Sequence, residues 1–230
     1  MRVMYSSLFA VTALATASLG ASAWAAGSNV ATTTQTGASN YAYVDQTGTD
    51  NWSDVGQTGG YNLADVDQTG RNDEATTTAF GDHNVQRITQ DGKGWGNEAV
   101  NAAYGNGNIQ TIDQVNEGNE ATNIAYGSGN GQYIVQGGRD NIALNKVTYG
   151  GYGNTQTINQ TGHDNDAVNT ASWGGFNTQA IEQSGNWNAA ENHVNGGGFN
   201  TQYITQGASG NYAVQTASGV GNFAQINQNN

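Results

Sequence analysis

The sequence of 230 residues contains no cysteine and no proline, and it has only six basic residues against 18 acidic ones. Without cysteine the chain can form no disulfide, no thiolate nucleophile and no thiolate metal site. The absence of proline favours uninterrupted backbone hydrogen-bond ladders, because proline breaks them. The formal net charge of −12 argues against nucleic acid and anionic membranes as partners, since both require clustered Lys and Arg.

The first residues have the pattern of a secretory signal peptide. Arg2 provides the positive charge, Leu8 to Leu19 is a short apolar stretch, and Ala23-Trp24-Ala25 is a small-x-small cleavage pattern. The apolar stretch is too short to make a good membrane span, and no later segment is apolar enough for one. We therefore expect a signal peptide over residues 1–25, a short linker over residues 26–28 and a secreted product without a membrane span.

The rest of the chain consists of eighteen imperfect seven-residue units that start with Asn or, once, Asp and begin 11 to 13 residues apart. One version has the form Asn-x-Gln-x-Ile-x-Gln, as in Asn154–Gln160. The other has the form Asn-x-Ala-x-Asn-x-Ala, as in Asn165–Ala171. The first four units are hybrids that begin as the second version and end in Gln, as in Asn40–Gln46.

Alternation with a period of two predicts β-strands, and the Gly-rich segments between the units predict turns. One unit offers only about 2–4 kcal/mol of apolar burial, which cannot offset the backbone entropy of about 1–2 kcal/mol per ordered residue. The units must therefore stack, with like residues on like and with Asn and Gln amides forming ladders. The predicted fold is an all-β solenoid of about nine stacked strand-arch-strand rungs over residues 29–230.

Two sets of inward residues follow from this fold. The predicted ladder and assembly residues are Asn40, Gln46, Asn62, Gln68, Gln86, Ile88, Gln90, Gln110, Ile112, Gln114, Gln132, Ile134, Gln136, Gln156, Ile158, Gln160, Gln179, Ile181, Gln183, Gln202, Ile204 and Gln206. The predicted docking residues of the two terminal rungs are Asn29, Ala31, Gln35, Val44, Asn211, Ala213, Asn222, Ile226 and Gln228. Because both terminal rungs keep the repeat pattern, each is a template for another molecule, and we expect head-to-tail stacking of the chain on itself.

The units resemble the curlin repeats of bacterial curli fibres. The family pattern Gln-x-Gly-x-x-Asn-x-Ala-x-x-x-Gln is intact from Gln35 to Gln46 and again from Gln57 to Gln68, and the resemblance covers residues 29–228. It implies an extracellular amyloid subunit of the biofilm matrix that mediates surface adhesion. It also implies two partners, a nucleator subunit and an outer-membrane secretion pore. The Gly-rich export segment of the major subunit is missing, and the sequence leaves open whether this chain is a major subunit or a nucleator.

Other chemistry has less support in the sequence. The three histidines, His83, His163 and His193, belong to different rungs, so the sequence predicts no metal or catalytic cluster and no cofactor. Most carboxylates occupy outward or turn positions, where solvated charge limits aggregation. The chain is therefore predicted not to be an enzyme.

Two alternatives to a fibre subunit remain. A monomeric β-solenoid could bind ice or carbohydrate surfaces. Ice binding requires a regular Thr ladder, whereas outward Thr76 and Thr78 are followed one rung later by Val100 and Ala102. A disordered matrix polypeptide would show no strict alternation.

Overall fold

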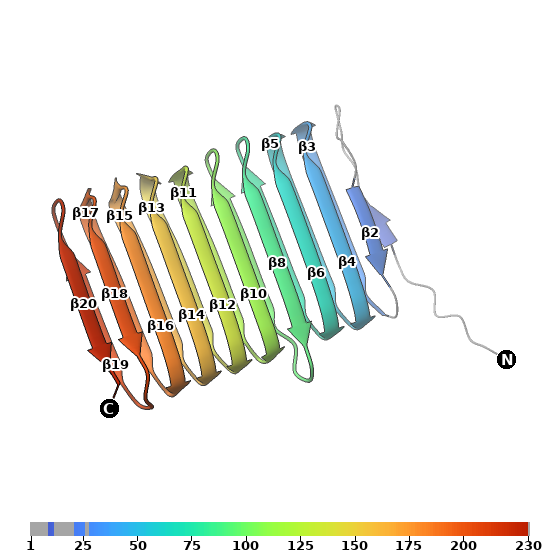
Figure 1. Ribbon diagram of the computed structural model, residues 1–230. Helices are drawn as coiled ribbons and strands as arrows, with labels where there is room; N and C mark the ends of the chain where they lie inside the picture. Colours follow the sequence, from blue (N-terminus) through green and yellow to red (C-terminus); the bar gives the residue numbers. More distant parts are fainter. Residues whose placement is uncertain (1–8, 12–20, 26–27, 230) are drawn as a thin grey trace.

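The computed structural model describes residues 9–11, 21–25 and 28–229, in which every regular element is a β-strand. The strands form two parallel sheets of ten, which alternate along the chain (Figure 1). The odd sheet contains β1 (Phe9–Val11), β3 (Val30–Ala38), β5 (Trp52–Gly60), β7 (Glu74–Phe80), β9 (Glu98–Tyr104), β11 (Glu120–Ser128), β13 (Ile142–Tyr152), β15 (Asp166–Gly175), β17 (Ala189–Gly198) and β19 (Tyr212–Ala217). The even sheet contains β2 (Ala21–Ala25), β4 (Tyr41–Thr49), β6 (Leu63–Arg71), β8 (Val85–Gly92), β10 (Ile109–Glu117), β12 (Gly131–Arg139), β14 (Thr155–His163), β16 (Thr178–Asn186), β18 (Thr201–Gln206) and β20 (Phe223–Gln228).

Each odd strand and the even strand after it form one rung, and β3 to β20 make nine rungs that coincide with the sequence repeats. Neighbouring strands pair with like residues in register, so that β12 places Ile134 beside Ile158 and Gln136 beside Gln160 of β14. The predicted all-β solenoid of nine two-strand rungs is therefore confirmed. The inserted residues lie in the arches, where the pairing of β11 with β13 and of β13 with β15 shifts register.

The core is a thin layer between the two sheets. Burial alternates along every strand of the repeats, and the isoleucines at positions 88, 112, 134, 158, 181 and 204 are at most 1% exposed. Alanines of the odd sheet, such as Ala99 and Ala121, belong to the same apolar cluster. Large residues of one sheet thus meet small residues of the other, which keeps the layer closely packed. The strands of one rung run in opposite directions across this layer, and Gln46 at the end of one unit donates Nε2–H to the Val30 carbonyl at the start of the other.

The arches depend on glycine because successive rungs bring them into close contact. Gly138 has φ of 110°, and a Cβ atom built on it would lie 1.9 Å from the Gly162 carbonyl oxygen of the next rung. No side chain fits at this distance. Glycine in this column therefore sets how closely the rungs stack.

Two short strands precede the repeats. β1 pairs in parallel with β3, and β2 pairs with β4 in a register that places Ala23 beside Val44 and Ala25 beside Gln46. These strands belong to the predicted signal peptide, most of which lies outside the described residues, as does most of the predicted linker. The first rung therefore accepts parallel strands that do not carry the repeat pattern.

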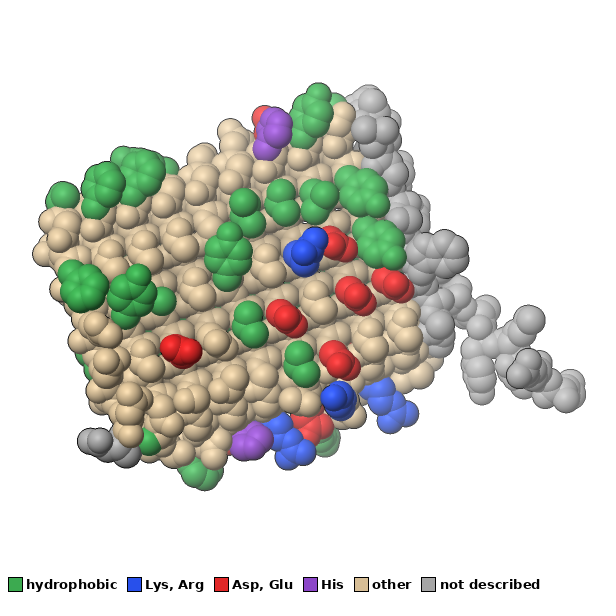
Figure 2. Space-filling model, in the orientation of Figure 1, with side chains coloured by type: hydrophobic (Ala, Val, Ile, Leu, Met, Phe, Trp, Pro, Cys, Tyr) green, Lys and Arg blue, Asp and Glu red, His purple; other side chains and the backbone are tan. Residues whose placement is uncertain are grey.

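The outer surface is mainly neutral and polar. Figure 2 shows the charged side chains of one face gathered over the N-terminal and middle rungs, with the C-terminal rungs almost free of them. No helix in the described part of the chain is long and apolar enough to cross a membrane.

Candidate assembly site: amide ladders and the two ends of the stack

Four inward positions of each unit form eight columns that run along the stack. In the unit at β14 these positions are Asn154, Gln156, Ile158 and Gln160, numbered here from first to fourth. All the predicted inward ladder residues are at most 1% exposed. Their burial places them in the core, while their part in assembly between molecules stays a prediction.

The asparagine ladder at the first position donates toward the preceding rung. Asn62 donates its backbone N–H and its Nδ2–H to Asn40 Oδ1, each over 3.1 Å. Its second Nδ2 proton bonds the Gly81 carbonyl of the following arch at 2.7 Å. In the even sheet this column runs from Asn40 to Asn222, where Asn222 Nδ2 donates to Asn200 Oδ1 over 2.8 Å.

The glutamine ladder at the fourth position of the even sheet donates in the opposite direction, toward the following rung. Gln46 Nε2 donates to Gln68 Oε1 over 2.8 Å, and the last step joins Gln206 to Gln228 over the same distance. The other Nε2 proton bonds a backbone carbonyl of the odd sheet, as between Gln114 and Glu98 at 2.9 Å. Each glutamine therefore ties its rung to the next rung and to the opposite sheet.

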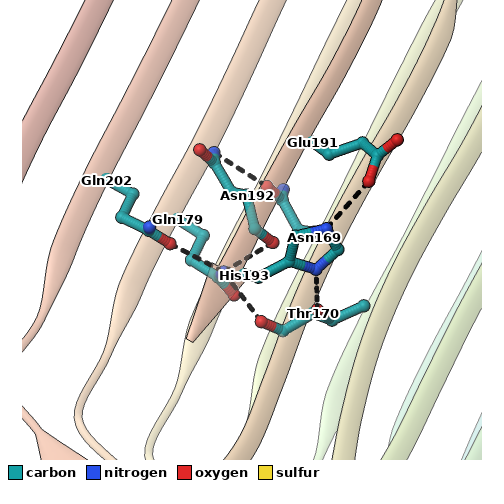
Figure 3. A network of polar contacts seen from close by, with 7 residues as sticks. All are labelled: Asn169, Thr170, Gln179, Glu191, Asn192, His193 and Gln202. Carbon is teal, nitrogen blue, oxygen red and sulfur yellow. Dashed lines mark hydrogen bonds and ion pairs between the residues drawn. The ribbon is translucent and has the colours of Figure 1, made fainter. Parts of the chain in front are cut away.

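Two further ladders cover only the middle of the stack. Glutamines occupy the second even position from Gln86 to Gln202, and asparagines occupy the third odd position from Asn101 to Asn192. Figure 3 shows one step of each: Asn192 donates to Asn169 over 3.1 Å, and Gln179 donates to Gln202 over 3.1 Å. The buried odd-sheet asparagines were not among the predicted ladder residues, although their alternation with alanine was visible in the sequence.

Where a ladder ends, an amide atom remains without a partner. Seven buried side-chain atoms of the described residues accept or donate no hydrogen bond, and four of them are ladder ends. They are Gln46 Oε1, Gln86 Oε1, Gln202 Nε2 and Asn192 Oδ1. The second-position glutamine ladder of the even sheet thus begins with a free acceptor and finishes with a free donor, and the fourth-position ladder begins with a free acceptor. The middle asparagine ladder finishes with a free acceptor. The direction of each ladder gives the two ends of the stack different chemistry.

One carboxylate interrupts the asparagine ladder of the odd sheet. Asp73 replaces Asn at the first position, is fully buried, and accepts hydrogen bonds from Asn97 N, Asn97 Nδ2 and Gly92 N. Burial raises the pKa of this carboxyl above its ordinary value, and the hydrogen bonds from Asn97 and Gly92 partly counter the rise. In several other rungs of this sheet the arch presents a carbonyl to an Asn Nδ2, as Gly138 does to Asn119 over 3.2 Å. Here it presents the Gly92 N–H to a carboxylate.

The two predicted terminal rungs differ in exposure. At the N-terminal rung Asn29, Ala31, Gln35 and Val44 are at most 3% exposed, since β1 and β2 pair with the strands of this rung. At the C-terminal rung Asn222 is exposed and Ile226 and Gln228 are partly exposed. Among the described residues, β19 and β20 are the last strands of their sheets and pair on one side only.

The outward side chains show no metal site in the described part of the chain. His193 lies on the outer face of β17, where Nδ1 is 2.6 Å from Thr170 Oγ1 and Nε2 is 2.8 Å from Glu191 Oε2 (Figure 3). His83 stacks on Tyr61 in another arch, and His163 lies at the end of β14. The three histidines are thus far apart along the stack, in three different rungs.

Comparison with known proteins gives one match. Residues 28–59 match the family model described as curlin associated repeat. This segment includes the first two odd units and the even unit between them. No curated protein and no solved structure significantly matches the chain.

Proposed function

The chain carries the curlin associated repeat and folds as a β-solenoid, and from these two findings we propose that it is a structural subunit of curli-like extracellular amyloid fibres. The subunits stack head to tail, with the rung of residues 29–46 of one molecule on the rung of residues 211–228 of another. The role is structural and not enzymatic.

The direction of the amide ladders is the observation that carries this proposal. In such a joint Gln228 Nε2 of one molecule meets the acceptor Gln46 Oε1 of the next, which has no partner among the described residues. The amides of Asn40 meet Asn222 Oδ1 by the same rule that joins Asn62 to Asn40. A head-to-head joint would pair the terminal strands antiparallel, so that the first inward position meets the fourth and the parallel, like-on-like columns that join neighbouring rungs do not continue.

The inward residues of the two ends also match in size. In the joint Ala31 lies on Ala213, Ala42 on Ala224 and Val44 on Ile226. The middle glutamine ladder stops before both ends, since Ala42 and Ala64 precede it and Ala224 follows it. Alanine therefore meets alanine at the joint, and no glutamine of that ladder is left facing the neighbouring molecule.

Processing at the predicted cleavage site would open the N-terminal face. β1 and β2 occupy the place that the preceding molecule takes in the proposed joint. Removal of residues 1–25 uncovers the first rung, so the unprocessed chain is expected to dock only through its C-terminal rung. The proposal includes secretion through an outer-membrane pore, a nucleator subunit as partner, and a role in biofilm matrix and surface adhesion.

A monomeric solenoid that binds ice or carbohydrate is the second candidate. Its support is limited to the solenoid fold, because the outward column through Thr76, Val100, Thr122 and Leu144 is irregular in size and polarity. A flat ice-binding face requires the same residue in every rung. Sedimentation after incubation separates the two: a fibre subunit is expected to move into sedimenting fibres, whereas a monomeric binder stays in the supernatant.

Two variants of the processed chain, residues 26–230, test the head-to-tail joint. Outward residues donate their backbone N–H to the following rung, as Tyr41 does to Asn62 and Thr201 to Asn222, each over 2.8 Å. Neighbouring residues alternate, so inward N–H groups face the preceding rung. Val44→Pro therefore removes a donor from the N-terminal face, and Gln225→Pro removes one from the C-terminal face.

Each variant alone keeps one functional face and is expected to stay monomeric in analytical ultracentrifugation. An equimolar mixture is expected to give dimers with one copy of each variant, which do not grow further. Dimers in either variant alone, or no dimers in the mixture, would overturn the proposed joint.

A further inference from the structure

The fourth inward column of the odd sheet changes composition after two rungs. Gln35 and Gln57 begin it, and Gln35 Nε2 donates to Gln57 Oε1 over 2.8 Å. The next seven members are small or branched apolar residues: Ala79, Ala103, Ala125, Val147, Ala171, Val194 and Ala217. The first two rungs thus carry a glutamine ladder in both sheets, and the remaining rungs carry it at this position in the even sheet only.

This change leaves one mismatch in a joint between two copies of the chain. Gln35 of one molecule would lie on Ala217 of the other, which has no amide to donate to Gln35 Oε1. The neighbouring column is compatible, because the Thr33 hydroxyl can donate to Gln215 Oε1, which has no partner among the described residues. In the proposed joint, the fourth odd position is therefore the one inward position at which the C-terminal face of the chain offers no hydrogen-bond donor to the amide of the N-terminal face.

We propose that the N-terminal face of this chain is built to dock on a second kind of chain. The terminal rung of that partner carries Asn at the first and Gln at the fourth inward position of both strands, as the second rung of this chain does. The proposal rests on the stacking of rungs proposed above. The partner's odd-sheet glutamine supplies the donor to Gln35 Oε1 that Ala217 lacks.

The family match covers the same rungs as this ladder. Residues 28–59, which match the curlin associated repeat model, contain both glutamines of the odd column. The first two rungs, which carry Gln at the fourth inward position of both sheets, thus act as an adaptor to a chain with the same pattern. The later rungs carry Gln at this position in the even sheet only. In a mixed fibre this chain adds to the C-terminal face of a consensus chain more tightly than to its own.

The paired dimer of the proposed function provides the assay. One member, Val44→Pro, offers only its C-terminal face and is made with or without Ala217→Gln, which gives that face the partner's glutamine. The other member, Gln225→Pro, offers only its N-terminal face and is made with or without Gln35→Ala. Thr216→Gln is the matched control, because it adds the same side chain at the adjacent exposed position.

The dissociation constant of each of these four pairs, and of the two control pairs with Thr216→Gln, is measured by fluorescence anisotropy. Ala217→Gln is expected to lower it about tenfold when Gln35 is present, which corresponds to one satisfied buried amide. It is expected to have no such effect when the other member carries Gln35→Ala, and Thr216→Gln is expected to have none in either case. Circular dichroism confirms that each variant is folded.

An unchanged dissociation constant with Ala217→Gln would overturn the proposal. An equal gain whether or not Gln35 is present would also overturn it, since the gain would then not pass through the Gln35 amide. If the parent pair forms no dimer at all, the stacking proposal fails and this one with it. A parent pair that dimerises without the tenfold gain refutes the adaptor proposal alone.

Discussion

Gln206 donates its side-chain amide to Gln228 over 2.8 Å, and with this bond the fourth-position ladder of the even sheet reaches the last rung. The asparagine column of the same sheet donates in the opposite direction, so the two ladders leave different groups at each end of the stack. A solenoid of identical rungs could in principle add material in either orientation. The ladders of this chain favour one orientation, because only head-to-tail contact continues every amide column in parallel register, with each donor on the acceptor of the same column.

Inward and outward positions of the same strand are expected to tolerate a charge very differently. Ile158→Asp places a carboxylate in the fully buried column, at a cost of several kcal/mol. Thr157→Asp adds the same side chain on the outer face of β14, where water solvates it. Fibre formation followed with an amyloid dye is expected to fail for Ile158→Asp and to proceed for Thr157→Asp. Equal rates of assembly would contradict the inward assignment.

A glutamine in the middle of a ladder is expected to contribute more than one at its end. Gln132→Met removes the hydrogen bonds to Gln110, Gln156 and the Ile124 carbonyl, and it leaves the Gln156 side-chain oxygen without this donor. We expect a loss of about 2–4 kcal/mol in the free energy of unfolding. Gln202→Met removes a single ladder bond and an unpaired donor, so its cost is expected to be about 1 kcal/mol or less. Denaturant titration of both variants checks the order, and equal midpoints would count against the ladders.

Close stacking of the arches predicts a contrast between two glycines. Gly138→Ala would bring a methyl group within 1.9 Å of the Gly162 carbonyl oxygen, which forces the rungs apart. Gly107 also has positive φ, at 65°, but a methyl group there meets nothing within 4 Å. Gly107→Ala is therefore expected to cost only the backbone strain of about 1–2 kcal/mol. Thermal unfolding followed by circular dichroism should show a much larger loss for Gly138→Ala, and similar losses would contradict the model of arch stacking.

Because several carboxyl groups are partly or fully buried, the solenoid is expected to be more stable at mildly acidic pH than at neutral pH. Burial raises the pKa of Asp54, Asp67, Asp73 and Asp166 above the ordinary carboxyl value of 3.8. Each then binds protons more tightly in the folded state than in the unfolded state. The free energy of unfolding must therefore fall as pH rises from the ordinary value through the raised one.

Asp73→Asn is expected to reduce the loss of unfolding free energy with rising pH, because it removes a fully buried carboxyl group from the four aspartates with raised pKa. Asp113→Asn, on the outer face of β10, is the matched control and is expected to keep the slope of the parent chain. Denaturant midpoints between pH 4 and pH 7 measure the effect. A stability that rises with pH over this range would show that the sign is wrong.

The sequence was sufficient to predict the solenoid because its period of two is strict. Alternation from Gln156 to Gln160 admits only a strand, and the spacing of the units admits only stacked rungs. Inward and outward faces followed directly from this, since a shift of one residue would have turned Ile158 to solvent. The apolar content of each rung was too small for any fold in which the units do not stack.

The direction of the ladders could not be predicted from the sequence. An amide can donate to either neighbour, and which one it chooses depends on side-chain torsions set by the arches and the opposite sheet. The altered arch at Asp73 could not be predicted for the same reason. Its shape depends on the hydrogen bond that the Gly92 N–H donates to the Asp73 carboxylate. The strands β1 and β2 were not predicted either, since their sequences lack the repeat pattern and pair only through the backbone.

The most direct test of the central claim is a distance between residues of two molecules in the fibre. Fibres are grown from an equimolar mixture of processed chains, half labelled with ¹³C at Val44 and half with ¹⁵N at Ile226, and are examined by solid-state nuclear magnetic resonance. Head-to-tail stacking predicts magnetisation transfer between these two positions, because they lie on adjacent strands about 5 Å apart. A second mixture, half labelled with ¹³C and half with ¹⁵N at Val44, is the control for the opposite orientation. Transfer in this control, with none between Val44 and Ile226 in the first mixture, would contradict the account.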